Sequence, residues 1–415
     1  MSSLCTLQIS KPLNFYDNSK LDRCTDEIVI SDDKSSDINK SSTISNQFLL
    51  KGIVLNCQSI QAKKPAFHAM VHQYHPDFIV GTESWLTADI LNNEIFPHGY
   101  NIYRKDRPDG YGGVFFACRD NILCRQLSLN TTCEIVACKL NVDNFAPLII
   151  LSIYRPPYRD IEYMQNLCDL VEEIITEHFD CTIWITGDLN LPDIDWNTHS
   201  IVGSNYPVGL SSLFLDLLNY SGCVQLNNVP TRANNILDIF ATNKPSLISH
   251  CCVVPGVSDH EALYIESLLI LSVLPPFQRK VFLWNKADFS HINNLMSHWC
   301  SQFLSSNTVD TPIQELWDKF KSSCLKCMDL IPTKSTSKKF HQPWITSHIK
   351  RLTKRKQRLY NRAKASKLES DWTAYCNIKK WSNLNVGNHM TSTYPISLIQ
   401  TLTVATSGYG HILKT

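Results

Sequence analysis

The sequence predicts an α/β fold in which sheets are stacked in layers and flanked by helices. Short apolar runs alternate with segments of helical periodicity along most of the chain. Three successive apolar runs, "GGVFFAC", "EIVACKL" and "PLIILSIY", have no helical pattern between them. Because neighbouring parallel strands need a crossover, usually a helix, this order favours mixed sheets over a purely parallel one. A chain of 415 residues, 43% of them hydrophobic, can bury at least one sizeable core.

Each predicted strand is a short apolar run, and each predicted helix has apolar residues three or four positions apart. Strands are expected over residues 52–57, 77–83, 112–118, 134–140, 147–154, 181–186, 236–242 and 261–268. Helices are expected over residues 65–75, 167–175 and 210–218. The second of these has the clearest period, with Leu167, Leu170, Val171, Ile174 and Ile175 on one face.

Composition divides the chain into four segments. Residues 1–46 are rich in Ser, Asp, Asn and Lys, which predicts a disordered polar leader. The strand and helix signals fill residues 47–274 and predict one large domain that ends at "LPPF". Residues 275–381 are expected to form a helical connector with a basic segment, and residues 382–415 an irregular tail.

Charge is unevenly distributed along the chain. Residues 349–381 hold eleven Lys and Arg against two Asp and Glu, a local net charge of +9. Because the whole chain is only +1, the remainder carries −8, and the basic block suggests a polyanionic partner. We find no secretory signal and no apolar stretch of ~18 residues that could span a membrane. A nuclear or cytoplasmic location is therefore expected.

Polar residues stand where several predicted strands begin or end. They are Asn56, Glu83, Tyr154, Asp188, Asn190, Asp238, Asp259 and His260. Singly, each has an ordinary explanation as a turn, cap or loop residue, and "GDLN" has the pattern of an Asx turn. Asp238 is harder to explain in this way, because it interrupts an apolar run and a buried carboxylate needs a partner such as histidine. The ends of adjacent strands converge, so the whole set is typical of a catalytic cluster.

An ordered series of motifs carries a family resemblance over about residues 51–269. The motifs are "LNCQSI", "GTESWL", "YRKDRPDGYGGV", "SIYRPP", "WITGDLNLPDIDW", "PTRANNILDIFAT" and "VSDHEAL". The series resembles the endonuclease domain of non-LTR (LINE-type, jockey-like) retrotransposons, within the endonuclease/exonuclease/phosphatase superfamily. The resemblance implies a four-layer α/β sandwich, with two mixed sheets face to face and helices outside, followed here by a mainly helical C-terminal extension. It also implies metal-dependent hydrolysis of phosphodiester bonds.

The resemblance assigns the metal site to oxygen donors. It makes Glu83 the main ligand, with Asn56 and Asp259 close to the ion. Carboxylate and amide oxygens are the donors that Mg²⁺ or Mn²⁺ prefers to thiolates. Mg²⁺ or Mn²⁺ is therefore the expected cofactor.

The resemblance also assigns catalytic roles. It implies that Asp188 orients or deprotonates the attacking water, that Asn190 holds the scissile phosphate, and that Tyr154 contacts the phosphate or the leaving side. His260 would stabilise charge on the transition state, with Asp238 fixing its tautomer. Whether Asp188 or His260 is the general base stays open. The glycine of "GDLN" is expected to let the backbone turn closely.

Two further sets of residues are expected to contact nucleic acid. Arg155, Thr231 and Ser258 match substrate-binding positions of the family, the last two at a DNA-facing rim. The basic segment offers Lys350, Arg351, Lys354, Arg355, Lys356 and Arg358 to phosphates of DNA or of element RNA. The segment around them resembles the connector to a reverse transcriptase, but no Tyr/Phe-x-Asp-Asp motif follows it. The expectation is a truncated element product that nicks DNA and does not copy RNA.

Three functions compete at this point. The first is an endonuclease that nicks one strand of duplex DNA. The second keeps the fold but acts on abasic DNA or a small phosphoester. The third is a catalytically silent fragment that only binds nucleic acid. The third would be indicated by the loss of an acid such as Glu83 or Asp188, and both are present.

Overall fold

A computed structural model describes residues 49–143, 145–157, 160–274, 279–307, 311–336, 342 and 344–393 of the chain. The predicted leader, residues 1–46, lies outside these residues, as does the end of the chain beyond residue 393. Within the described residues, no helix combines the length and apolarity that crossing a membrane requires.

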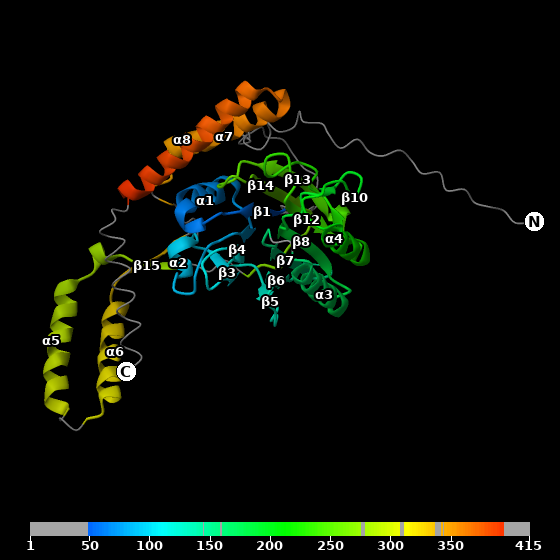
Figure 1. The fold of residues 1–415 in the computed structure, drawn as a ribbon. Coiled ribbons are helices and arrows are strands. Elements are labelled where there is room, and N and C mark those ends of the chain that lie inside the picture. The colour runs from blue at the N-terminus through cyan, green and yellow to red at the C-terminus, as the bar shows by residue number, and fades with distance from the viewer. Residues whose placement is uncertain are drawn as a thin grey trace, which may run out of the picture. The chain divides into compact units, whose positions relative to one another are not determined.

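Two six-stranded mixed sheets form the core of the fold (Figure 1). The first sheet has the order β13-β14-β1-β2-β4-β3. Its strands are β1 (Leu50–Asn56), β2 (Phe78–Thr82), β3 (Tyr100–Lys105), β4 (Val114–Arg119), β13 (Ile248–Val254) and β14 (Ala262–Ser267). β1 and β2 are parallel, whereas the other neighbours are antiparallel.

The second sheet repeats this plan in the order β11-β12-β8-β7-β6-β5. Its strands are β5 (Cys124–Gln126), β6 (Glu134–Leu140), β7 (Leu148–Tyr154), β8 (Thr182–Asp188), β11 (Val224–Gln225) and β12 (Asp238–Thr242). Here β7 and β8 are the parallel pair. A short hairpin of β9 (Ile194–Asp195) and β10 (Ser200–Ile201) follows β8.

Alternate residues of the central strands pack in different layers, as the period of two requires. Val54 and Phe78 of the first sheet share the inner core with Ile150 and Trp184 of the second. Outward-facing neighbours pack instead against helices: α1 (Ile60–Tyr74) on the first sheet, α3 (Ile161–Glu177) and α4 (Val208–Ser221) on the second. The predicted α/β sandwich of two mixed sheets with helices outside is confirmed.

The sequence patterns did not predict β3 and β13, the two edge strands of the first sheet. β3 is half-buried or exposed along its length, and only the end of β13 is fully buried. Such strands lack the continuous apolar runs of strands that are covered on both faces. Short elements are α2 (Asn92–Ile95), η2 (Pro245–Leu247) and η3 (Trp284–Lys286).

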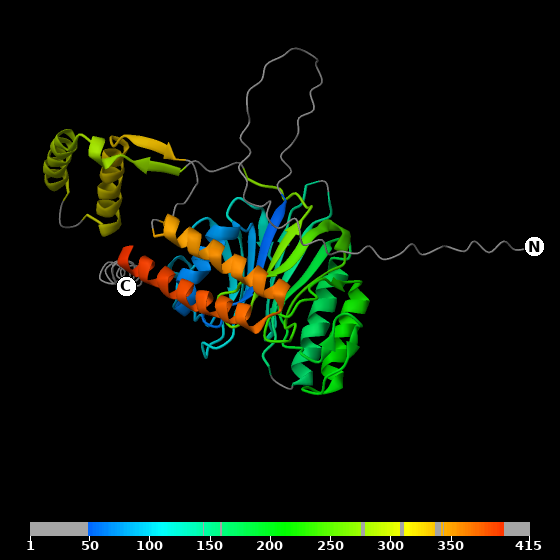
Figure 2. The ribbon, with the colours of Figure 1, turned by 90° about the horizontal axis from the view of Figure 1, so that it is seen from above.

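The C-terminal part is mainly helical, as predicted. It contains α5 (Phe289–Ser306), α6 (Ile313–Asp329), α7 (Ser347–Ser366), α8 (Glu369–Thr393) and a hairpin of β15 (Arg279–Phe282) with β16 (Thr333–Thr336). α7 and α8 lie side by side and both contact α1 (Figures 1 and 2). α8 continues past residue 381, where the irregular tail was expected, because Val386 and Met390 pack against Trp344 and Ile349. The boundary expected at residue 274 stays a prediction.

Candidate active site

Four of the predicted site residues point into the space between the two sheets at one end of the strands. They are Asn56 of β1, Tyr154 of β7, Asp188 of β8 and Asp238 of β12, all at most 5% exposed. In the second sheet, Asp188 stands opposite Tyr154 on one side and opposite Asp238 on the other. Period and register together therefore place these four residues at one end of the interior.

Strand period explains why Asp188 faces inward. Trp184, four residues before it, belongs to the inner core, whereas Ile183 and Ile185 face the helices. Asp188 therefore faces the space between the two sheets, beyond the apolar side chains that fill the inner core. Burying a carboxylate in such a position costs free energy unless partners compensate, so its partners define the site.

An amide group joins the acids of the two sheets. The Nδ2 of Asn56 donates to Glu83 Oε1 and to Asp188 Oδ2, each at 2.8 Å. Glu83 directly follows β2 and is half-buried, whereas Asp188 is fully buried. Burial and the charge of Asp238 raise the pKa of Asp188 to about 7, against the opposing effects of His260 and Asn56.

A second buried pair lies on the other side of Asp188. The Nδ1 of His260 is 2.7 Å from Asp238 Oδ2, and both side chains are at most 2% exposed. Burial opposes the charged form of the ring, but the hydrogen bond and charge of Asp238, with the charge of Asp188, raise the pKa of His260 to about 9. The predicted Asp238–His260 contact is thus present, and the two neighbouring carboxylates favour the imidazolium form of the ring.

Backbone strain is concentrated in the segments that carry the site. Glu83, Gln58 and Asn190 have φ angles of 47°, 43° and 49°, in the left-handed region that favours glycine. Each such residue costs on the order of 1 kcal/mol, and such positions are enriched at functional sites. The strain places the Glu83 carboxylate and the Asn190 amide where an unstrained turn would not.

The "GDLN" segment is both a turn and a strand end. Asp188 Oδ1 accepts from the Asn190 backbone N–H at 3.1 Å, while Asp188 Oδ2 accepts from Asn56. Gly187 has φ +134°, and a Cβ there would stand 1.9 Å from the Ile153 carbonyl oxygen of β7. The structure therefore bears out the expectation that this glycine permits a close approach of the backbone.

Arg155 lies inside the protein, where it braces this turn. Its guanidinium donates to the carbonyl oxygens of Leu189 and Asn190 at 3.2 and 3.1 Å, and only 1% of the residue is exposed. The Asn190 side chain returns a hydrogen bond to the Arg155 carbonyl at 2.9 Å. Arg155, expected from the sequence to bind substrate, thus contacts the backbone of the turn that carries Asp188 and Asn190, and direct substrate binding by it stays a prediction.

Thr231 and Ser258 are also internal, although a DNA-facing rim was expected for them. Thr231 Oγ1 accepts from the backbone N–H groups of Leu237 and Asp238. Ser258 Oγ donates to the Asn56 carbonyl at 2.7 Å. Both hydroxyls are buried, so they fix the backbone on which Asp238, His260 and Asn56 stand.

Two cations that the sequence analysis did not select lie close to the acids. Arg232 forms a 2.7 Å ion pair with Asp259, and both side chains are nearly half exposed. Lys63 of α1 donates to the Gln58 carbonyl; burial lowers its pKa, against the charges of Cys57, Asp259 and Glu83. Asp259 therefore contacts Arg232 at the surface, apart from the buried Asp188–Asp238–His260 cluster. In the sequence, these two cations are marked only by their closeness to motif residues: Lys63 comes shortly after "LNCQSI", and Arg232 directly follows Thr231.

The donor chemistry suits a hard divalent cation. Glu83 and Asp188 direct carboxylate oxygens to one nitrogen of Asn56. Ligand atoms of Asp188, Asp238 and His260 lie within 4.8 Å of one another. In the part of the chain that the structure describes, Asp238 Oδ1 is buried with no hydrogen-bond partner. Carboxylates that are this close repel one another, which a cation or a shared proton relieves.

Tyr154 retains its proton near the acids. Burial, followed by the charges of Glu83 and Asp188, raises the pKa of its hydroxyl well above the usual value. The phenol therefore keeps its proton at neutral pH and can donate a hydrogen bond.

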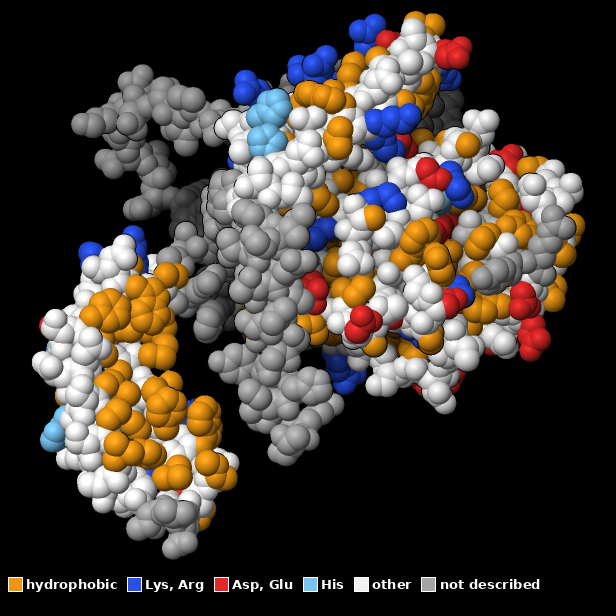
Figure 3. All heavy atoms as spheres, turned by 60° about the vertical axis from the view of Figure 1, so that its left-hand side comes forward, with side chains coloured by type: hydrophobic (Ala, Val, Ile, Leu, Met, Phe, Trp, Pro, Cys, Tyr) orange, Lys and Arg blue, Asp and Glu red, His pale blue; other side chains and the backbone are white. Residues whose placement is uncertain are grey.

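The basic segment presents most, but not all, of its predicted cations to solvent. Lys350, Arg351, Lys354, Arg355 and Arg358 of α7 are exposed. Lys356 is only 7% exposed, and burial lowers its pKa to about 8. Lys356 is therefore not available to a phosphate as the sequence suggested, because it faces the packed side of α7. Figure 3 shows Lys and Arg side chains on the helical pair at the top of the view.

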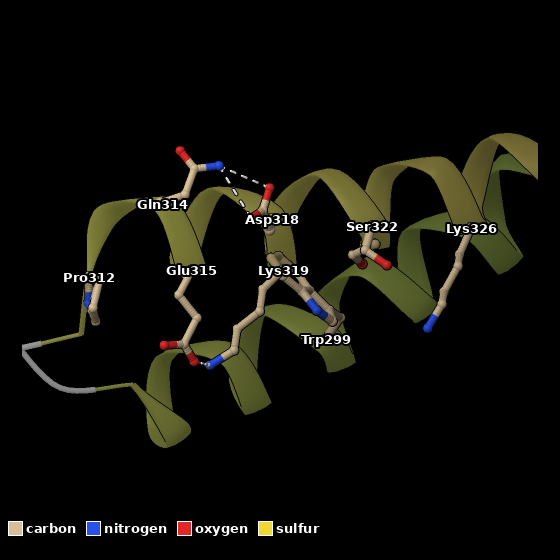
Figure 4. Close-up of a pocket in the computed structure, with 9 residues that line it drawn as sticks. Trp299, Pro312, Gln314, Glu315, Asp318, Lys319, Ser322 and Lys326 are labelled. Atoms are coloured by element: carbon tan, nitrogen blue, oxygen red, sulfur yellow. Dashed lines mark hydrogen bonds and ion pairs between the residues drawn. The ribbon is translucent and has the colours of Figure 1, made fainter.

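A separate hollow of about 730 Å³ lies between α5 and α6 (Figure 4). It is lined by side chains such as Trp299, Glu315 and Lys319. Glu315 and Lys319 form an ion pair of 2.7 Å, so these charges satisfy each other. None of the predicted catalytic residues lines this hollow.

Comparison with known proteins finds one family model and several solved structures that are similar to part of the chain. Residues 148–264, which include Asp188, Asp238 and His260, match the family described as endonuclease-reverse transcriptase. No curated protein matches the chain.

Solved structures that are similar to this chain include the following three. The endonuclease domain of TRAS1, a telomere-specific non-LTR retrotransposon, is 17% identical, with 54% of this chain and 99% of that chain covered and a TM-score of 0.42. The AP endonuclease LMAP from Leishmania major is 15% identical, with 53% and 87% covered and a TM-score of 0.45. The catalytic domain of Xenopus laevis APE2 is 15% identical, with 53% and 92% covered and a TM-score of 0.42.

Proposed function

We propose that the chain hydrolyses phosphodiester bonds and nicks one strand of duplex DNA, as an endonuclease of the non-LTR retrotransposon kind. The match of residues 148–264 to the endonuclease-reverse transcriptase family supports this proposal. The observation that carries the proposal is the position of Asp188. It stands between the Asn56–Glu83 pair and the Asp238–His260 pair, at a strand end within the matched region.

The residues present fit Mg²⁺ or Mn²⁺. Glu83 would hold the ion, with Asn56 and Asp259 beside it. Asp259 would first have to leave Arg232, with which it forms an ion pair at the surface. When bound, the cation supplies Lewis-acid stabilisation of charge on the phosphate oxygens.

The protein's own groups account for the proton transfers and for charge stabilisation. A water oxygen forms the new bond to phosphorus and loses a proton to Asp188, or to His260 if its ring is neutral. One phosphorus–oxygen ester bond breaks, and the leaving oxygen takes a proton from the His260 imidazolium or from solvent water, so that a phosphate is left on one side of the nick and a hydroxyl on the other. The Tyr154 hydroxyl, the Asn190 amide and the His260 imidazolium supply donors for the developing negative charge.

Asp238 acts through His260. Its carboxylate accepts a hydrogen bond from Nδ1 of His260. The N–H of the other ring nitrogen, Nε2, would then be the donor that faces the substrate. A carboxylate in this place also stabilises the imidazolium that the mechanism uses.

A nicking assay on supercoiled plasmid tests the proposal. The purified chain should convert supercoiled to open-circular DNA with Mg²⁺, and EDTA should abolish the reaction. Asp188→Asn should lower the rate by roughly 1,000-fold, as expected for the loss of an acid–base group. Asp195→Asn is the matched control, because Asp195 is a partly exposed acid just beyond the same turn.

A folded wild-type chain that leaves plasmid intact at every Mg²⁺ and Mn²⁺ concentration would refute the endonuclease proposal. Nicking that survives Asp188→Asn unchanged would refute the assignment of Asp188. A linear product without an open-circular intermediate would show double-strand cleavage in place of nicking.

The exposed cations of α7 support a second contact with nucleic acid. Lys350, Arg351, Lys354, Arg355 and Arg358 are exposed on a helix with few acidic neighbours. Each phosphate contact should add about 0.9 to the slope of log K against log salt for duplex DNA. Replacing Arg351 and Arg355 with Gln should reduce that slope by roughly 1–2, measured by fluorescence anisotropy on duplex DNA and on RNA.

A further inference from the structure

One carboxylate links the catalytic segment to the C-terminal helix α8. Glu261 directly follows His260 and begins the chain's entry into β14. Its carboxylate accepts from the Tyr375 hydroxyl at 2.8 and 2.9 Å, and from Lys379 Nζ at 2.9 Å. The same carboxylate accepts from the Gly256 backbone N–H at 2.7 Å. It therefore joins two residues of α8 to both ends of the segment 256–261.

This junction is more sheltered from solvent than an ordinary surface ion pair. Tyr375 is 2% exposed, and the side chains of Glu261 and Lys379 are 16% and 14% exposed. The Tyr375 ring packs 5.1 Å from the ring of Tyr360 of α7. Exposed ion pairs contribute little, whereas hydrogen bonds to a charged group in such surroundings hold their geometry strongly.

The segment held by Glu261 is tightly closed, so a displacement at one end reaches the other. A Cβ on Gly256 would stand 2.2 Å from the His260 carbonyl oxygen, which shows how closely the two backbones approach. The Glu261 N–H donates to the Thr231 carbonyl at 2.7 Å, and Thr231 in turn holds the backbone of Asp238. His260 and Asp238 are thus both connected to Glu261, the first through the chain and the second through Thr231.

We propose that Tyr375 and Lys379 of α8 are positioning residues for the reaction: through Glu261 they hold the segment that carries His260. The inference rests on the proposed function. The inference gives α8 a role in the reaction, although α8 lies more than 100 residues beyond the last catalytic motif. Because the two residues touch no reacting atom, their loss should change catalytic rate more than substrate binding.

The test compares matched variants of the full chain. Tyr375→Phe and Lys379→Gln remove the groups that hold Glu261. Tyr360→Phe and Lys380→Gln remove the same groups from the neighbouring ring and from an exposed lysine of α8. Each of the first two should lower kcat for plasmid nicking by about 10-fold with KM unchanged, since small misplacements of catalytic groups are costly. Lys379→Arg, which keeps a charged donor, should restore most of the rate.

Amide hydrogen exchange provides a readout that does not depend on nicking. Exchange across residues 255–261 should increase at least several-fold in Tyr375→Phe and Lys379→Gln, and should be unchanged in the two controls. If the wild-type chain does not nick DNA, the proposed function fails while this comparison still decides whether α8 holds the segment. Equal exchange in Tyr375→Phe and Tyr360→Phe, or equal kcat in an active enzyme, would overturn the inference.

Discussion

The two sheets have the same plan but contribute different environments to the site. The first sheet supplies Glu83, a half-buried acid just after β2 whose own backbone has a strained, positive φ angle. The second supplies Asp188 and Asp238, which are 0% exposed and lie within regular strands. A partly exposed carboxylate can exchange water for a cation, whereas a fully buried carboxylate is held by its protein neighbours. In the proposed function, the first sheet therefore serves metal binding through Glu83 and the second serves proton transfer through Asp188.

The largest effect that would sharpen this comparison is expected for Asp238→Asn. The amide leaves the volume unchanged but removes the charge that fixes the His260 ring. The nicking rate at saturating Mg²⁺ should fall about 100-fold, while the Mg²⁺ concentration for half-maximal rate stays the same. A large shift in that concentration would instead place Asp238 among the metal ligands.

Glu83→Gln should give the opposite pattern. It keeps a group able to accept from Asn56 but removes the charge that would attract the cation. The Mg²⁺ concentration for half-maximal nicking should rise roughly 10- to 100-fold, with much of the rate recovered at high Mg²⁺. A rate that stays low at every Mg²⁺ concentration, with an unchanged midpoint, would break the proposed division between the sheets.

Much of this site could be predicted because strands have a period of two. An apolar run that ends in Asn56, Tyr154 or Asp188 indicates that its last side chain continues an inner row. The Asp238–His260 pair was predictable because a buried carboxylate requires a partner. The half-buried edge strands β3 and β13 gave no such signal, since their burial depends on neighbours that are distant in sequence.

The directions of Arg155, Thr231 and Ser258 could not be predicted in the same way. A motif places a residue near the site but does not say whether its side chain faces the substrate or the backbone. Arg155 turns inward because the carbonyl oxygens of the "GDLN" turn need donors. The junction between Glu261 and α8 joins residues more than 100 positions apart, and a single sequence contains no local pattern for it.

Backbone geometry also differs between the sheets, which leads to a prediction for Gly187. At Glu83 the first sheet tolerates a side chain at positive φ, but at Gly187 a Cβ would meet backbone of β7. Gly187→Ala should lower the free energy of unfolding by about 3 kcal/mol or more, because a main-chain atom cannot move aside cheaply. Urea unfolding followed by tryptophan fluorescence would measure it. Gly222→Ala is the control, with φ +61° but open space at its Cβ, and should cost only about 1 kcal/mol.

The smallest expected effect concerns Lys356, on the helix that packs outside the first sheet. Burial lowers its pKa to about 8, aided by the charge of Lys379 and opposed by Glu261. Between pH 8 and its ordinary value of 10.5, the unfolded chain binds more protons at this residue than the folded chain does. The contribution of Lys356 to the free energy of unfolding should therefore increase with pH across that window, and it should be smallest below pH 8.

Lys356→Met should consequently raise the free energy of unfolding by about 1–2 kcal/mol at pH 7, since a buried charge is replaced by an apolar chain. The advantage should shrink as pH rises through 8 and disappear near 10.5, where the wild-type lysine is neutral in both states. Lys354→Met, at an exposed position of α7, should change stability by less than about 0.5 kcal/mol at either pH. Paired urea titrations at pH 7 and pH 10 would measure both variants. A Lys356→Met variant that loses stability at pH 7 would show that the lysine's attraction to Glu261 outweighs its burial.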